Sequence, residues 1–227
     1  MPDSGRMLAL AGFSEPVSSI THLAGAVVFA VLAVALLRRG RGARGRVLAL
    51  SVFAFSCVLL LSLSGVYHLL SPDTPGRDVL KRLDHAAIFL LIAGSFTPVH
   101  VILFRGAWRW GMLVLIWGLA LAGLVLKVLY LDAMPESLGL AMYLGLGWMG
   151  VFSGVILARR HGFRFIHLVL WGAFAYTGGA VSEYLRWPLL LGGVVGPHEI
   201  FHLAVLAGIG CHWAFILRIA AGGSGNP

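Results

Sequence analysis

The feature that most constrains this chain is a series of seven long apolar stretches separated by short polar or glycine-containing segments. A helix needs about 20 consecutive apolar residues to cross the hydrocarbon layer of a bilayer. The approximate ranges of the stretches are 17–37, 47–70, 84–104, 109–129, 137–158, 164–183 and 198–219. They lack the alternation of apolar and polar residues that is typical of a membrane β-barrel. The pattern therefore predicts an all-α membrane protein folded as a seven-transmembrane-helix bundle.

The composition agrees with this class. Of the 227 residues, 59% are hydrophobic and only 11% are charged, too few to cover the surface of a soluble domain of this length. A net charge of +8 would suggest a nucleic-acid partner for a soluble protein. Here the basic residues lie between the apolar stretches, where they contact lipid headgroups. We therefore expect a lipid bilayer and no nucleic acid as the partner, and the oligomeric state stays open.

The apolar stretches form one predicted domain between two short terminal segments. Residues 1–15 are interpreted as an interfacial N-terminal lead-in, because their apolar run is short and ends before acidic Glu15. Residues 16–220 are the predicted seven-helix transmembrane domain, and residues 221–227 are a glycine-rich tail predicted to be disordered. Residues 189–195, which follow the sixth stretch, would either extend its helix or form a re-entrant loop.

The basic residues also predict an orientation in the membrane. Seven crossings place the termini on opposite sides, which we call side A for the N-terminus and side B for the C-terminus. Of the 17 Lys and Arg residues, 11 fall on side B and 6 on side A. The largest cluster, Arg38, Arg39, Arg41, Arg44 and Arg46, lies on side B. The positive-inside rule then predicts a multi-pass protein of the cell (inner) membrane, with its N-terminus outside and its C-terminus in the cytoplasm.

Polar residues inside the apolar stretches are the candidates for function, because such groups are costly in a bilayer. Three helix ends on side A carry them. They are Ser64 and His68 at the end of the second stretch, Asp84 at the start of the third, and His198 and His202 at the start of the seventh. Residues four apart share one helix face, so His198 and His202 can bind one ion together.

Three imidazoles, those of His68, His198 and His202, would leave a fourth tetrahedral position for water, which is the pattern of a catalytic zinc site. Bound Zn2+ would lower the pKa of that water towards about 7 and supply a nucleophile. Asp84 could accept a proton from the water or orient it, and Ser64 could support the water or the transition-state oxyanion. We therefore predict these three histidines as metal ligands and Asp84 and Ser64 as catalytic residues.

Other polar residues receive smaller roles. Glu15 and His22 begin the first helix on side A, where they either support the metal ligands or serve only as a helix entry and an interhelical hydrogen bond. His212 lies nearly three turns beyond His202, about 15 Å deeper, so we expect it to pack inside the bundle. His100 lies nearer side B, and we expect it at the membrane interface.

Several motifs in combination resemble a known family. They are Glu15-Pro-Val-Ser-Ser-Ile-Thr-His22, Ser64-Gly-Val-Tyr-His68, Arg82-Leu-Asp84-His85, Ala93-Gly-Ser-Phe-Thr-Pro98, Tyr176-Thr-Gly-Gly-Ala and His198-Glu-Ile-Phe-His202. In this order they are similar to those of the haemolysin III proteins of bacteria, within the progestin and adipoQ receptor family. The resemblance extends over about residues 14–215.

The resemblance implies a seven-helix bundle with an intramembrane zinc held by His68, His198 and His202, with Asp84 and Ser64 close by. The adiponectin receptors and the wider superfamily of alkaline ceramidases suggest hydrolysis of a lipid amide with release of a fatty acid. The haemolysin name instead implies pore formation or cell lysis. The adiponectin receptors place the N-terminus and the zinc on the cytoplasmic side, whereas the arginine count of this chain predicts the opposite.

The predicted function is a zinc-dependent, ceramidase-like hydrolase of lipid amides that uses a metal-bound water and takes a lipid substrate or holds a fatty acid. One alternative is a haemolysin-type pore or channel, although the nearly apolar fourth and fifth stretches lack the polar stripe expected of one. A membrane-state receptor with a structural zinc is a second alternative, and a proton-coupled transporter is a third.

Overall fold

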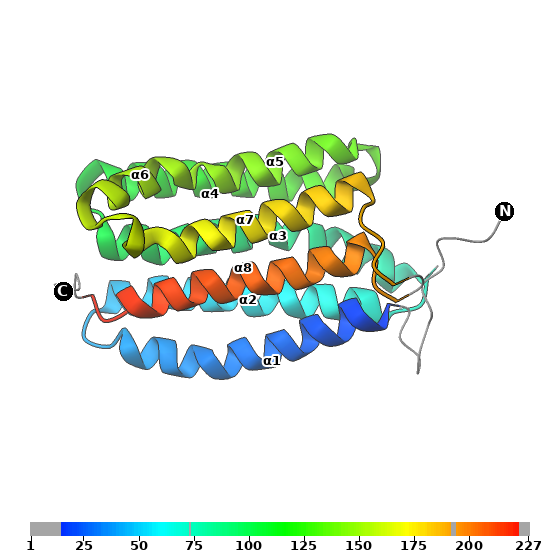
Figure 1. Ribbon diagram of the computed structural model, residues 1–227, viewed down its shortest axis with the longest axis horizontal. Helices are drawn as coiled ribbons and strands as arrows, with labels where there is room; N and C mark the ends of the chain where they lie inside the picture. The colour runs from blue at the N-terminus through cyan, green and yellow to red at the C-terminus, as the bar shows by residue number, and fades with distance from the viewer. Residues whose placement is uncertain (1–14, 73, 192–193, 223–227) are drawn as a thin grey trace.

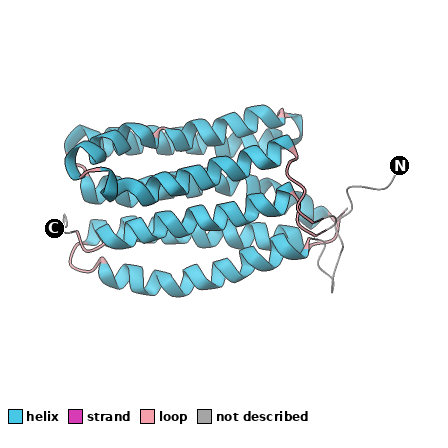
Figure 2. Ribbon diagram, in the orientation of Figure 1, coloured by secondary structure: helices cyan, strands magenta, loops and turns pink. Residues whose placement is uncertain are grey.

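The chain folds into a bundle of long helices that run almost parallel to one another (Figure 1). The computed structural model describes residues 15–72, 74–191 and 194–222. The elements in chain order are α1 (Pro16–Arg39), α2 (Arg44–Leu69), α3 (Pro75–Leu103), α4 (Gly106–Tyr130), the 3-10 helix η1 (Leu131–Ala133), α5 (Glu136–Trp148), α6 (Gly150–His161), α7 (Phe163–Leu185) and α8 (Pro197–Ile219). All regular elements in these ranges are helices, so the all-α class is confirmed (Figure 2).

Seven helical segments are long and apolar enough to cross a membrane. Helices α5 and α6 follow one another in nearly the same direction and together form the fifth segment, Glu136–His161 (Figure 1). The seven-helix bundle is therefore confirmed. The third helix begins at Pro75 rather than near residue 84. The apolar stretch underestimated its length, because the first turns of the helix carry charged residues and lie outside that stretch.

The described residues between α7 and α8 are not helical. Arg186 adopts a left-handed conformation with φ of 55°, which ends the helix at Leu185. Leu191 and Val195 then form an isolated antiparallel bridge. The alternative in which residues 189–195 extend the sixth helix is therefore wrong for the described part of this segment. The physical reason is that the backbone turns away at Arg186 and Pro188 has no N–H to continue the helix.

The two ends of the bundle correspond to sides A and B. The start of α1 and the end of α8 lie at opposite ends of the long axis, as expected for an odd number of crossings (Figure 1). The α1–α2, α3–α4 and α6–α7 connections lie at the side B end, and the α2–α3 and α7–α8 connections lie at the side A end. Of the predicted lead-in and tail, residues 1–14 and 223–227 fall outside the described residues.

The largest apolar core lies between α1, α2, α3 and α8. It includes Phe53, Leu61, Ile209 and Ile216, which are at most 1% exposed. Helices α2 and α3 approach closely at Gly94, where an added Cβ atom would clash with Ser56 Oγ. Close contact at small residues is how membrane helices gain packing energy, because lipid chains are as apolar as the helix surfaces. This packing fixes the relative positions of the helix ends on side A.

Candidate metal centre

Three histidines predicted as ligands meet at the side A end of the bundle. His68 lies in the last turn of α2, and His198 and His202 lie in the first two turns of α8. One ring nitrogen from each lies within 4.8 Å of the other two, and the Nε2 atoms of His198 and His202 are 3.1 Å apart. The rings of His68 and His202 have centroids 4.5 Å apart. The juxtaposition expected from helix parity is therefore present.

The carboxylate of Glu15 contacts the Nδ1 atom of His68. Nδ1 of this ring lies 2.5 Å from Glu15 Oε2, and the other oxygen of Glu15 accepts a hydrogen bond of 2.5 Å from Arg77. The Glu15 backbone N–H also donates to the His68 carbonyl at 3.2 Å. Burial acts to raise the pKa of Glu15. Its hydrogen bonds with His198 and His68, and the positive charges of these two rings, outweigh burial and hold this pKa well below its usual range. Glu15 thus presents an anionic acceptor, which leaves Nε2 of His68 for a metal.

His198 has a similar partner on α7. Its Nδ1 lies 3.3 Å from Glu183 Oε1, an oxygen that also accepts a 2.9 Å hydrogen bond from Arg186. The sequence prediction missed Glu183. The available signal was an acidic residue in the last turn of the sixth stretch, on the same side of the membrane as the histidines.

His202 pairs with a fourth histidine, His22 of α1. Its Nδ1 lies 3.0 Å from His22 Nε2 and 3.2 Å from His22 Nδ1, and both rings are about 3% exposed. His22 Nε2 faces the His202 carbonyl oxygen at 3.2 Å, which can only accept, so His22 Nδ1 is the acceptor in the neutral ring. When Nδ1 of His202 donates its hydrogen to His22 Nδ1, Nε2 of His202 retains a lone pair directed at His198. The structure therefore places both Glu15 and His22 against the predicted ligands.

The donor set fits a zinc ion. Each of the three Nδ1 atoms contacts a carboxylate or another imidazole, so each Nε2 can act as a ligand. Metal-binding histidines usually have their second ring nitrogen held in this way, which fixes the ring and raises its basicity. Three neutral imidazoles with one open position form a donor set that zinc accepts in catalytic sites.

Glu199 occupies the position of the general base in the zincin sequence HExxH, but it has another role in the structure. Its Oε2 accepts a 2.9 Å hydrogen bond from the Gly196 N–H, and its Oε1 accepts one of 3.3 Å from the Ser18 hydroxyl. The side chain is 1% exposed. One oxygen therefore caps α8, and the other connects it to α1.

The two predicted catalytic residues lie at the same end of the bundle. Ser64 is one turn before His68 on α2 and is 2% exposed. Its hydroxyl neighbours the carboxyl of Asp84 on α3. The catalytic roles of both residues stay predictions.

The remaining histidines lie outside the cluster. His212 Nε2 is 3.3 Å from the Val169 carbonyl, in the interior position expected for it. The interfacial position expected for His100 is wrong: its side chain is fully buried, with Nε2 2.8 Å from Ser153 Oγ. Depth along α3 could be read from the sequence, but which face of α3 meets α6 depends on how the helices pack.

Replacing Glu15 with Gln is expected to weaken zinc binding by about 10- to 100-fold, because an amide loses the charge that orients the His68 ring and raises its basicity. The measurement is a competition titration of the purified protein against a zinc chelator. Glu136→Gln is the matched control, since Glu136 is an exposed acidic residue on side A that pairs with Arg186. Equal affinities in Glu15→Gln and the wild type would contradict a supporting role for Glu15.

Comparisons with known proteins place the chain in a family. The family model described as "Haemolysin-III related" matches residues 12–213. Hemolysin-3 of Bacillus cereus is 32% identical over 200 residues, which cover 86% of each chain. The hemolysin-3 homolog of Bacillus subtilis is 27% identical over 197 residues, covering 86% of this chain and 88% of the relative. Together with the seven membrane-spanning helices, these matches show that the chain belongs to the haemolysin-III-related family of multi-pass membrane proteins.

Proposed function

We propose that this protein is a zinc-dependent hydrolase of lipid amides. The observation that carries the proposal is the convergence of His68, His198 and His202, each with its second ring nitrogen held by a neighbouring side chain. Three ligands leave a position open, which distinguishes catalytic zinc sites from closed structural ones.

The chemistry assigns a role to each residue beside the cluster. Zinc bound by three imidazoles supplies an activated water near neutral pH. Asp84 accepts a proton from the attacking water and delivers it to the departing amine, which is general acid–base catalysis. The Ser64 hydroxyl donates a hydrogen bond to the oxygen that becomes negatively charged as the amide carbonyl is attacked. The burial of Ser64 strengthens that interaction by excluding bulk water.

An apolar cavity inside the bundle, near the cluster, supports a lipid as the substrate. This narrow cavity has a volume of about 140 Å³ and includes Leu60, Ile88 and Phe201 in its lining. Leu60 is one turn from Ser64, and Phe201 is adjacent to His202. Because its walls are mostly apolar, the cavity suits an acyl chain.

We also propose that side A, and with it the metal centre, faces the outside of the cell. The arginine cluster from Arg38 to Arg46 lies in and around the α1–α2 connection on side B. Arginine in short connections is retained in the cytoplasm, which supports a cytoplasmic C-terminus.

The test of the proposed hydrolase is metal removal and restoration. Zinc-loaded protein in lipid nanodiscs is expected to release fatty acid from at least one member of a panel of ceramides and N-acyl amides. A chelator should abolish the release, and added zinc should restore it, because the activated water depends on the ion. The fatty acid is measured by mass spectrometry.

The panel also separates the alternatives. A zinc-loaded, folded protein that releases no fatty acid from any member would contradict the hydrolase. If metal removal unfolds the bundle and no turnover is seen with zinc, the ion has a structural role, as in a receptor.

A further inference from the structure

A second polar pair lies inside the bundle, away from the metal cluster. His100 Nε2 is 2.8 Å from Ser153 Oγ, and both residues are at most 3% exposed. His100 lies near the side B end of α3 and Ser153 lies in α6, whereas the metal cluster lies at the side A ends of α2 and α8. The pair is therefore separate from the proposed metal centre.

The hydrogen bonds of His100 define which ring nitrogen carries the hydrogen. Its Nδ1 is 3.0 Å from the Phe96 carbonyl oxygen, which can only accept a hydrogen bond. In the neutral ring Nδ1 therefore carries the hydrogen, and Nε2 is the acceptor for the Ser153 hydroxyl. A serine that donates to a histidine whose other nitrogen is held by an acceptor is the arrangement of an activated nucleophile.

The hydroxyl of Ser153 differs from several others in these helices. Ser51, Ser95, Thr97 and Thr177 each donate to a carbonyl one turn earlier in their own helix, which is the common pattern for such residues. The hydrogen bond of Ser153 instead runs to an imidazole on another helix. Its hydrogen is thus directed at a base.

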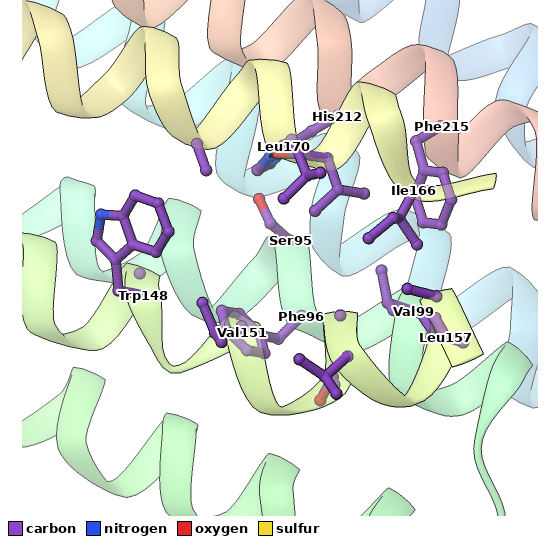
Figure 3. Close-up of a pocket in the computed structure, with 18 of the residues that line it drawn as sticks. Ser95, Phe96, Val99, Trp148, Val151, Leu157, Ile166, Leu170, His212 and Phe215 are labelled. Carbon is purple, nitrogen blue, oxygen red and sulfur yellow. Dashed lines mark hydrogen bonds between the residues drawn. The ribbon is translucent and has the colours of Figure 1, made fainter. Parts of the chain in front are cut away.

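Both residues line a second cavity, larger than the one near the metal cluster, which we call the wide cavity. It has a volume of about 550 Å³, within the range typical of sites for small organic ligands. Apolar side chains face it from two sides, including Phe96, Trp148 and Leu157 on one side and Ile166 and Leu170 on the other (Figure 3). A long hydrocarbon chain matches this lining.

The wide cavity reaches the surface between α6 and α7. Its lining includes Val151 and Val155, which are each 44% exposed, and Phe163, which is 74% exposed. In a bilayer these apolar side chains contact lipid chains. A membrane lipid can therefore enter from the side and bring an ester group to Ser153.

We propose that Ser153 is a nucleophile, activated by His100, that accepts the acyl group of a long-chain ester bound in the wide cavity. Ser153 Oγ attacks the ester carbonyl carbon and forms a new C–O bond, while its proton passes to His100 Nε2. The bond to the leaving alcohol breaks, and that alcohol takes the proton from His100. Water then attacks the acyl-serine with the same help, releasing a fatty acid and restoring Ser153.

A covalent probe tests this proposal without knowledge of the natural ester. Hexadecyl fluorophosphonate is incubated with the full-length protein in nanodiscs, and the adduct is located by peptide mass spectrometry. The P–O bond to Ser153 forms, the P–F bond breaks, and fluoride leaves as His100 takes the hydroxyl proton. We expect the adduct on Ser153, no adduct there in Ser153→Ala, and labelling at least about 100-fold slower in His100→Gln, since a general base contributes that much or more.

Two further variants complete the experiment. Ser95 lines the same cavity but donates to the Leu91 carbonyl, so Ser95→Ala should label like the wild type. His161→Ala, which changes an exposed histidine of α6 outside the cavity lining, should also label at the wild-type rate. The adduct forms on Ser153 and needs no metal, so failure of the proposed zinc hydrolase leaves this result unchanged. Three results would overturn the proposal: a folded wild type that does not label, unchanged total labelling in Ser153→Ala, or a wild-type labelling rate in His100→Gln. The elution volume on gel filtration verifies that each variant is folded.

Discussion

Purified His202→Ala is expected to contain only a trace of zinc, where the wild type binds about one ion per chain. His202 supplies the nitrogen closest to His198 and is nearly fully buried, so water cannot easily take its place. Removing it leaves two imidazoles, and the loss of a ligand from a three-histidine site is far more damaging than the loss of a supporting contact. His68→Ala is expected to behave in the same way.

Zinc per chain is measured by elemental mass spectrometry after gel filtration in detergent. The matched control is His161→Ala, because His161 is an exposed histidine at the opposite end of the bundle. It should retain the full content. Equal zinc in the wild type, His68→Ala and His202→Ala would show that the cluster does not bind the ion.

Asp84→Asn should retain zinc but lose fatty-acid release by about 100- to 10,000-fold, the usual contribution of a general acid–base residue. Asn has nearly the same shape as Asp, so the packing beside Ser64 is preserved while the capacity to accept a proton is removed. The loss should appear in kcat, because Asp84 acts on the reacting groups rather than on the acyl chain.

The control for Asp84→Asn is Asp132→Asn. Asp132 is 63% exposed on side A and forms an ion pair with Arg82, so its replacement should leave turnover unchanged. Asp84→Asn with normal zinc content and a wild-type rate would remove Asp84 from the mechanism. If the same variant loses its zinc, Asp84 contributes to the metal centre rather than to proton transfer.

The fold is predictable because the bilayer imposes a simple length rule on each helix. Runs such as Val17–Leu37 contain no charged residue, and counting such runs also gives the side on which each helix ends. That parity by itself assigns His68 and His202 to the same face of the membrane. Run length misplaces a helix end where the helix extends beyond the apolar layer, as at Pro75, since charged turns are indistinguishable from a loop in the sequence.

The partners of the site residues are harder to predict because they depend on helix rotation. Parity places Glu183 on side A, but only packing shows that it reaches His198. Glu199 matches a metalloprotease motif by sequence, yet its side chain caps α8. The burial of His100 likewise depends on the face of α3 that meets α6. Sequence spacing gives depth, and tertiary packing decides which side chains at one depth touch.

The distribution of the connections has a consequence for assembly. On side B, short covalent turns join α1 to α2, α3 to α4 and α6 to α7. On side A, the histidine cluster and its partners connect the ends of α1 and α2 with those of α7 and α8, through Glu15, His68, Glu183 and His202. A bound ion would therefore be a cross-link between the first and last hairpins of the chain. Part of the binding free energy of the ion would offset the entropy cost of holding α2 and α8, which are far apart in the sequence, next to each other. Coordination would thus connect two helices on side A that no short backbone connection joins.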